Sequence, residues 1–183
     1  MTQLAAVPVP DAFEIRTNAT FEALMLALSR PGSAHSLPAP GMAGLAETLL
    51  DRECQVFCDD PALAEICAGF GAALVPAARA DHLFLSLDTP EGLALLEQAP
   101  VGSALYPDAG ATVIASARLG AGQRLRLTGP GIETFTDIEL GDLAPGLWPL
   151  RAARCRYPAG FDLFLICEGR VIGLPRSTTI EVL

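Results

Sequence analysis

The segment that most constrains the fold of this chain runs from Phe161 to Cys167 and is apolar at every position except Asp162. Such a run is typical of a central strand covered on both faces, because an exposed face would place a polar residue at every second position. Glu168 and Gly169 are predicted to turn the chain into a second apolar segment, residues 170–174. The sequence therefore predicts a sheet with other elements packed on both faces.

Strands and helices are expected to alternate in the first half of the chain. Residues 53–58 and 82–87 have the composition and alternation of strands. Each is followed by a capping residue and a proline, Asp60-Pro61 and Thr89-Pro90, which predict helices that end near residues 69 and 98. Two strand-helix units follow from this pattern.

Antiparallel pairing is expected later in the chain. Residues 112–118 and 123–128 are joined by Leu-Gly-Ala-Gly, the pattern of a β-hairpin, and leucine alternates with arginine in the second arm. The chain also ends in a predicted strand. We expect one α/β domain over residues 1–183, with three layers (α/β/α) around a mixed central sheet.

The N-terminal part is predicted to form an arm over residues 1–19, followed by a helix that Thr20 caps. The apolar side chains of that helix recur at helical spacing, at Phe21, Leu24, Met25 and Leu28. Arg30-Pro31-Gly32 is expected to end it, because proline disfavours helix in the residue before it.

Two stretches rich in glycine and proline are predicted to be loops, residues 33–41 and 141–149, and a short helix is expected over residues 43–51. Trp148 lies in the second loop. We expect its side chain to anchor packing or an interface.

The charged residues exclude several classes of function. All 12 basic residues are arginine, against 21 acidic residues, and the formal net charge is −9. Nucleic acid is therefore not an expected partner, because its phosphates require clustered positive charge. Without lysine the chain cannot form a Schiff base with pyridoxal phosphate, so no cofactor is expected.

The apolar composition predicts a partner surface. Apolar residues make up 51% of the chain, which leaves few polar side chains to cover the outside of a domain of this size. We expect some of this surface to be covered in a homodimer or by another subunit. The alternative is that alanine is simply scattered over the surface.

The cysteines and the N-terminus predict no metal site, membrane segment or export signal. Five cysteines are present without Cys-x-x-Cys spacing, and only two histidines, His35 and His82, accompany them. Cys54 and Cys58 are expected to be free thiols on one face of a strand. The sequence lacks a long apolar run and a signal-like start, so we expect a soluble cytoplasmic protein.

Arg30 and Arg176 are candidate anion-binding residues, since a guanidinium binds phosphate or carboxylate through two hydrogen bonds. Thr178 would add a hydroxyl donor beside Arg176. The alternative is that each arginine pairs with a carboxylate such as Glu22, Asp162 or Glu181. Asp162 lies within an apolar strand and is expected to be bonded either as a structural clamp or within a site.

Gly129 and Gly131 flank a proline and form either a rigid strand-end bend or a concave turn whose N–H groups bind an anion. No catalytic residue is predicted. His35 and His82 are far apart in the sequence, and no nucleophile motif accompanies Cys155 or Cys167. An independent cysteine or serine hydrolase is therefore the weakest of the functions considered.

Five segments resemble, in order and spacing, the PhnH family of the bacterial carbon–phosphorus lyase system. They cover most of the chain and comprise Phe21–Gly32, Tyr106–Ile114, Leu127–Ile132, Tyr157–Ile166 and Gly173–Val182.

The resemblance implies a fold, an assembly and a role. The fold would be a reduced pyridoxal-phosphate-dependent transferase domain without the cofactor, and the chain would form a homodimer. It would join PhnG, PhnI and PhnJ in a core complex. That complex forms ribose 1-methylphosphonate 5-triphosphate from ATP and methylphosphonate, before a radical step breaks the C–P bond.

We therefore expect a noncatalytic or accessory subunit in organic phosphonate catabolism. The alternative that the residues leave open is a small-molecule binding protein for a nucleotide or phosphonate. Its anion site would lie at a dimer interface and use Arg30 or Arg176.

Overall fold

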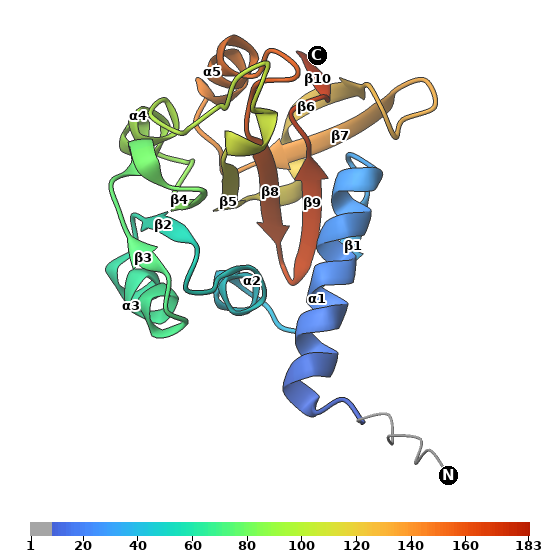
Figure 1. Ribbon diagram of the computed structural model, residues 1–183. Coiled ribbons are helices and arrows are strands. Elements are labelled where there is room, and N and C mark those ends of the chain that lie inside the picture. Colours follow the sequence, from blue (N-terminus) through green and yellow to red (C-terminus); the bar gives the residue numbers. More distant parts are fainter. Residues whose placement is uncertain (1–8) are drawn as a thin grey trace.

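A seven-stranded mixed sheet forms the centre of the computed structural model, which describes residues 9–183 (Figure 1). The strand order is β1-β9-β8-β5-β4-β2-β3. The strands are β1 (Ala34–Ser36), β2 (Gln55–Cys58), β3 (Ala73–Leu74), β4 (His82–Leu85), β5 (Thr112–Ser116), β8 (Asp162–Cys167) and β9 (Arg170–Leu174).

The predicted central strand is confirmed. β8 pairs with β5 in parallel and with β9 antiparallel, and β5, β4, β2 and β3 continue the parallel part. Glu168 and Gly169 both have positive φ, 49° and 78°, in the tight turn between β8 and β9. Side chains of β8 alternate between two apolar cores, one on each face of the sheet.

Three helices cover one face of this sheet: α1 (Ala12–Ser29), α2 (Met42–Leu49) and α3 (Pro61–Gly69). Gly173 of β9 allows α1 to lie directly on the sheet, because a Cβ atom there would be 2.6 Å from the backbone carbon of Ala27. Figure 1 shows α1 running beside β9 and β1. This face agrees with the predicted layer of helices.

The opposite face differs from the three-layer prediction, because a second sheet shares it with the helices. α4 (Pro90–Leu96) and α5 (Leu147–Arg154) pack there beside an antiparallel sheet of order β10-β6-β7. The strands of this sheet are β6 (Arg118–Thr128), β7 (Thr136–Gly141) and β10 (Thr179–Val182). Leu125 and Leu127 point from it into the shared core and are fully buried.

The hairpin expected over residues 112–128 is wrong. β5 pairs with β4 and β8 in the large sheet, whereas β6 pairs with β7 and β10 in the small one. The Leu-Gly-Ala-Gly segment lies within β6, where the pairing with β7 shifts register between Leu119 and Gln123. The two glycines therefore serve a bulge rather than a turn.

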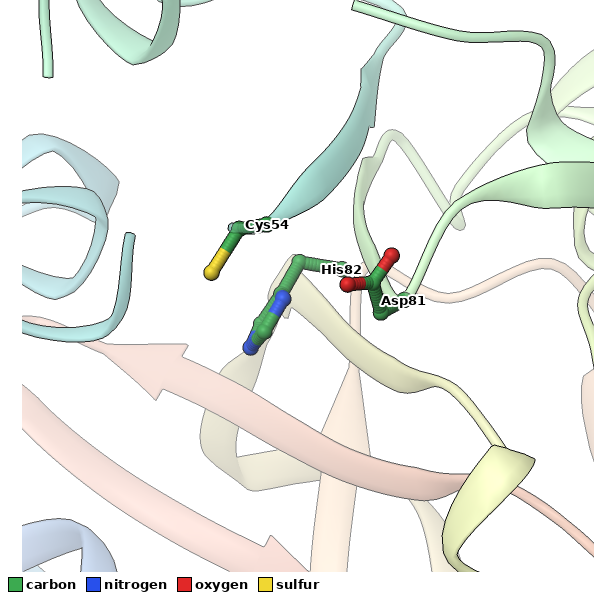
Figure 2. A group of neighbouring side chains, drawn as sticks. All are labelled: Cys54, Asp81 and His82. Atoms are coloured by element: carbon green, nitrogen blue, oxygen red, sulfur yellow. The ribbon is translucent and has the colours of Figure 1, made fainter. Parts of the chain in front are cut away.

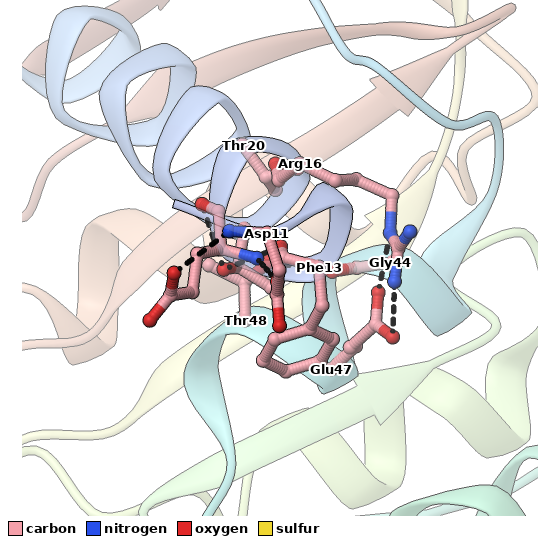
Figure 3. A network of polar contacts seen from close by, with 9 residues as sticks. Asp11, Phe13, Arg16, Thr20, Gly44, Glu47 and Thr48 are labelled. Atoms are coloured by element: carbon pink, nitrogen blue, oxygen red, sulfur yellow. Dashed lines mark hydrogen bonds and ion pairs between the residues drawn. The ribbon is translucent and has the colours of Figure 1, made fainter. Parts of the chain in front are cut away.

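The first helix begins earlier than predicted. Asp11 caps it, accepting a hydrogen bond from the Glu14 N–H while Glu14 accepts one from the Asp11 N–H, in a capping box (Figure 3). Thr20, the predicted cap, is buried in mid-helix. Residues 12–19 are therefore helix and not an arm, and residues 1–8 of the predicted arm lie outside the described part.

An ion pair links the first two helices. Arg16 donates two hydrogen bonds to Glu47 of α2, at 2.8 and 2.9 Å (Figure 3). This contact holds the early turns of α1 against α2. It therefore stabilises the helical turns before Thr20, which were predicted to form an arm.

Local capping signals elsewhere are confirmed. Asp60 and Thr89 cap α3 and α4, each followed by proline in the first turn. Two corrections fall in the predicted loops: the short strand β1 lies in residues 33–41, and α5 begins at Leu147 within residues 141–149. Trp148 is a packing anchor, as it is only 4% exposed in the core. Single 3₁₀ turns span Ala77–Arg79 and Pro107–Ala109.

Candidate functional site

Two cavities differ in the charge of their walls. One, of about 370 Å³, lies beyond the carboxyl ends of β2, β4 and β5. Acidic side chains line it, from Asp59, Asp60, Asp88 and Asp142. Their negative charge disfavours any anionic ligand.

The other cavity, of about 200 Å³, is basic and lies between α5 and the segment that joins β9 to β10. Its wall includes two of the predicted anion-binding residues, Arg176 and Thr178, together with Arg151 of α5. Trp148, Cys155 and Tyr157 complete that side of the cavity. We take this basic cavity as the candidate functional site.

Arg151 is the central residue of the basic cavity. Its side chain is only 3% exposed and donates hydrogen bonds to three carbonyl oxygens, of Leu174 (3.3 Å), Pro175 (2.7 Å) and Thr178 (3.0 Å). Burial lowers the pKa of the guanidinium, because its charged form has lost water. Arg151 makes no ion pair within residues 9–183, so its positive charge is not neutralised by a direct partner.

Two buried polar groups of the cavity have no hydrogen-bond partner among the described residues. They are the Nε–H of Arg151 and the hydroxyl of Thr178. Buried polar groups usually have partners, since leaving one unpaired costs about 1–3 kcal/mol. A ligand with acceptor oxygens would pair with both groups only if it displaced the side chains that now cover them.

Arg176 is bound by Asp162 at the edge of the cavity. Its Nη2 lies 2.7 Å from Oδ2 of Asp162, and its Nε lies 3.2 Å from Oδ1. The backbone N–H of Arg176 also donates to Oδ1, and Nη1 donates to the carbonyl of Pro107. The hydrogen bond with Asp162 raises the pKa of Arg176. Asp162 is thus one of the three carboxylate partners that the sequence suggested for an arginine.

The charges of the site leave a net positive value. Arg151 and Arg176 contribute two positive charges, and Asp162 contributes one negative charge. A cavity of about 200 Å³ is smaller than the ~300–1,000 Å³ typical of sites that enclose a whole drug-sized ligand. The arrangement can therefore hold one phosphate, phosphonate or carboxylate group, with the remainder of a larger compound passing Tyr157, which is 75% exposed.

The other predicted site residues lie outside this cavity. Arg30 is exposed at the end of α1, and within residues 9–183 its side chain forms no hydrogen bond or ion pair. Gly129 and Gly131 have positive φ and pack against the backbone of Ser177 and Ser29, where a side chain would collide. The two glycines thus form a packed bend that joins the end of α1 to the Ser177–Thr178 segment.

The histidines do not form a hydrolase site with each other. His35 lies on β1, where its Nε2 is 2.8 Å from the hydroxyl oxygen of Ser33, whereas His82 lies on β4, with β9, β8 and β5 between the two strands.

Cys167 is not suited to act as a nucleophile. Burial raises the pKa of its thiol to about 11. A thiol in that state is a poor nucleophile.

Arg151 is the site residue that sequence reasoning missed. Its bonding partners are 23 to 27 residues away in the chain, so no local motif includes them. The available signal was an arginine three residues after Trp148, whose side chain the sequence predicts to anchor packing or an interface.

Among residues 9–183, none of the helices combines the length and the apolar character that crossing a membrane requires.

Comparisons with known proteins agree on one family. Residues 12–181 match the family model described as bacterial phosphonate metabolism protein (PhnH). The chain is 34% identical to HtxG of Stutzerimonas stutzeri, named as a proposed C-P lyase subunit, over 99% of this chain and 96% of that protein. It is 30% identical to subunit PhnH of the alpha-D-ribose 1-methylphosphonate 5-triphosphate synthase of Rhizobium meliloti (strain 1021), over 88% of each.

Proposed function

This chain belongs to the PhnH family of bacterial phosphonate metabolism, and we propose that it acts as an accessory subunit of a carbon–phosphorus lyase core complex. Its partners would be subunits like PhnG, PhnI and PhnJ, and the reaction it supports would form ribose 1-methylphosphonate 5-triphosphate from ATP and methylphosphonate. The observation that carries this proposal is the match over residues 12–181, together with a relative named as a subunit of that synthase.

An exposed apolar stripe on α1 supports the role of a subunit. Phe13, Phe21 and Met25 recur along one side of the helix and are 49–53% exposed. Large apolar side chains gathered on one helix face are typical of an interaction surface. The proposal includes a homodimer and a cytoplasmic location, and a reduced pyridoxal-phosphate transferase fold without cofactor.

The accessory role is tested by reconstitution. Product formation is measured with PhnG-, PhnI- and PhnJ-like subunits, with and without this chain. We expect the chain to raise the rate, and we expect Cys155→Ala and Ser177→Ala to leave turnover within a few-fold of the wild type. Loss of turnover in either variant, while the complex still assembles and the chain still binds methylphosphonate, would show instead that this chain takes part in the chemistry.

The basic cavity supports a second candidate function, the binding of a phosphonate or phosphate group within the same complex. Its unpaired donors, the Arg151 Nε–H and the Thr178 hydroxyl, are buried beside the cavity and would pair with an anion that carries several oxygen acceptors. Both functions are compatible, since a subunit can hold a substrate group while another chain reacts with it.

Methylphosphonate binding is tested by calorimetry on the isolated chain. Thr178→Val removes one hydroxyl at nearly constant shape, and the loss of a hydrogen bond to a charged ligand should weaken binding roughly 10–100-fold. Arg30→Ala is the control, because that arginine is exposed away from the cavity wall. Equal affinity in the wild type and Thr178→Val, or loss in the Arg30 control, would reject the basic cavity as the binding site while leaving the subunit role untouched.

A further inference from the structure

A cysteine, an aspartate and a histidine meet at the beginning of two neighbouring strands. The thiol of Cys54, a carboxylate oxygen of Asp81 and a ring nitrogen of His82 all lie within 4.8 Å of one another. Figure 2 shows the three side chains gathered where β2 and β4 begin. This group has no part in the basic cavity.

The parallel pairing of β2 with β4 creates the group. Val56 is the register partner of His82, so Cys54, which directly precedes β2, comes close to the residues that lead into β4. Asp81 directly precedes His82. Backbone hydrogen bonds fix both flanking residues, since the Cys54 carbonyl accepts from the Ala73 N–H and the Asp81 N–H donates to the Gln55 carbonyl. Cys54 and Asp81 are 27 positions apart in the sequence.

The state of His82 calls for a partner. Its Nδ1 atom is buried and makes no hydrogen bond within the described residues. A neutral imidazole offers the lone pair of one ring nitrogen to a metal ion. An unpaired buried ring nitrogen is unusual in a folded protein.

The surrounding carboxylates favour a cation. Asp51 Oδ1 accepts a hydrogen bond from the Cys54 thiol at 3.3 Å. Both carboxylate oxygens of Asp81 accept a hydrogen bond from the backbone N–H of Gln55, each at 3.1 Å. A carboxylate has about four lone-pair sites, so Asp81 retains acceptor capacity. Neither aspartate forms an ion pair with an arginine in the part of the chain described here.

A purely structural explanation covers only part of the group. Asp81 fixes the start of β2, and Cys54 packs as a half-buried thiol, as the sequence predicts for it. Neither role provides a partner for His82 Nδ1.

We propose that Cys54, Asp81 and His82 bind a zinc ion, with the fourth position open to water. Thiolate, imidazole and carboxylate are the donor types that Zn²⁺ takes, at about 2.0–2.3 Å, and tetrahedral geometry then places ligand atoms roughly 3.5 Å apart. Donors within 4.8 Å reach that spacing by closing about 1 Å. The thiolate and the carboxylate together balance the charge of the ion.

The ion would stiffen the edge of the sheet that also carries the basic cavity. His82, Thr112 and Asp162 are register partners across β4, β5 and β8. With strands about 4.8 Å apart, the zinc site lies roughly 10 Å from the Asp162–Arg176 pair. The zinc proposal stands independently of the proposed function, and departs from the expectation of no metal that the cysteine spacing gave.

The test uses the full chain without an affinity tag, titrated with Zn²⁺ by calorimetry and with Co²⁺ by absorption spectroscopy. We expect one ion per chain and a thiolate-to-cobalt charge-transfer band. Loss of an outer-shell partner costs about 10–100-fold in metal affinity, so Cys54→Ser and His82→Asn should each weaken binding at least about 100-fold.

Matched controls use the neighbouring residues of the same kind. Cys58→Ser and His35→Asn should bind metal like the wild type. Absence of binding, binding that survives both Cys54→Ser and His82→Asn, or loss in the controls would overturn the proposal. Should a variant not fold, alkylation of the wild type decides, because Zn²⁺ should protect Cys54 and leave Cys58 unchanged.

Discussion

Replacing Arg151 by methionine should destabilise the protein by about 3 kcal/mol. The arginine ties α5 to the segment after β9 through three carbonyl groups, and hydrogen bonds from a charged donor contribute about 1.5–3 kcal/mol each. Two effects reduce the sum. In the variant the Pro175 carbonyl still accepts a hydrogen bond from the Thr178 N–H, so it is not left unpaired. The variant also avoids the cost of burying a charge.

The change is measurable by urea unfolding followed by far-ultraviolet circular dichroism. Domains are usually stable by about 5–15 kcal/mol, so a loss of 3 kcal/mol would move the midpoint clearly. Arg170→Met is the matched control, since that arginine is exposed on β9 and its removal should change the stability by no more than about 0.5 kcal/mol.

The outcome separates two views of Arg151. A loss below about 1 kcal/mol would mean that the three hydrogen bonds only offset the cost of burying the guanidinium. Arg151 would then contribute little to the stability of the fold. A loss of about 3 kcal/mol in unfolding free energy, with Arg170→Met as stable as the wild type, would support the role of Arg151 in linking α5 to the segment after β9.

Three further changes have defined outcomes. Asp162→Asn should cost about 2 kcal/mol in urea unfolding, because it weakens a half-buried pair with Arg176; an unchanged midpoint would contradict the clamp. Gly173→Ala should cost about 1–3 kcal/mol, since its Cβ would strike the Ala27 backbone, and wild-type thermal stability would refute this contact. Burial raises the pKa of Cys58 to about 11, so at pH 8 iodoacetamide should modify it roughly 100-fold more slowly than the unfolded chain; equal rates would refute that shift.

The parts of the fold that depend on local chemistry could be predicted from the sequence. Asp60-Pro61 and Thr89-Pro90 mark the starts of α3 and α4, because capping and proline act within one helical turn. The apolar run after Asp162 identifies the central strand, since burial on both faces requires it.

Strand partners and the site could not be predicted in the same way. Alternation shows which side chains of residues 112–128 are buried, but it does not show that the chain changes sheets at Ala117. Arg176 and Asp162 were identified as a possible pair, yet Arg151 reaches its carbonyls only once α5 has packed. Cys54 and His82 likewise meet only through the pairing of β2 with β4.

The most direct test of the subunit role is the mass of the assembly by light scattering. The chain is measured alone and then after co-expression with PhnG-, PhnI- and PhnJ-like subunits. We expect a dimer that enters a larger complex, and we expect Phe21→Ser on α1 to reduce that entry. A monomer that remains separate from all three partners would contradict the proposed role.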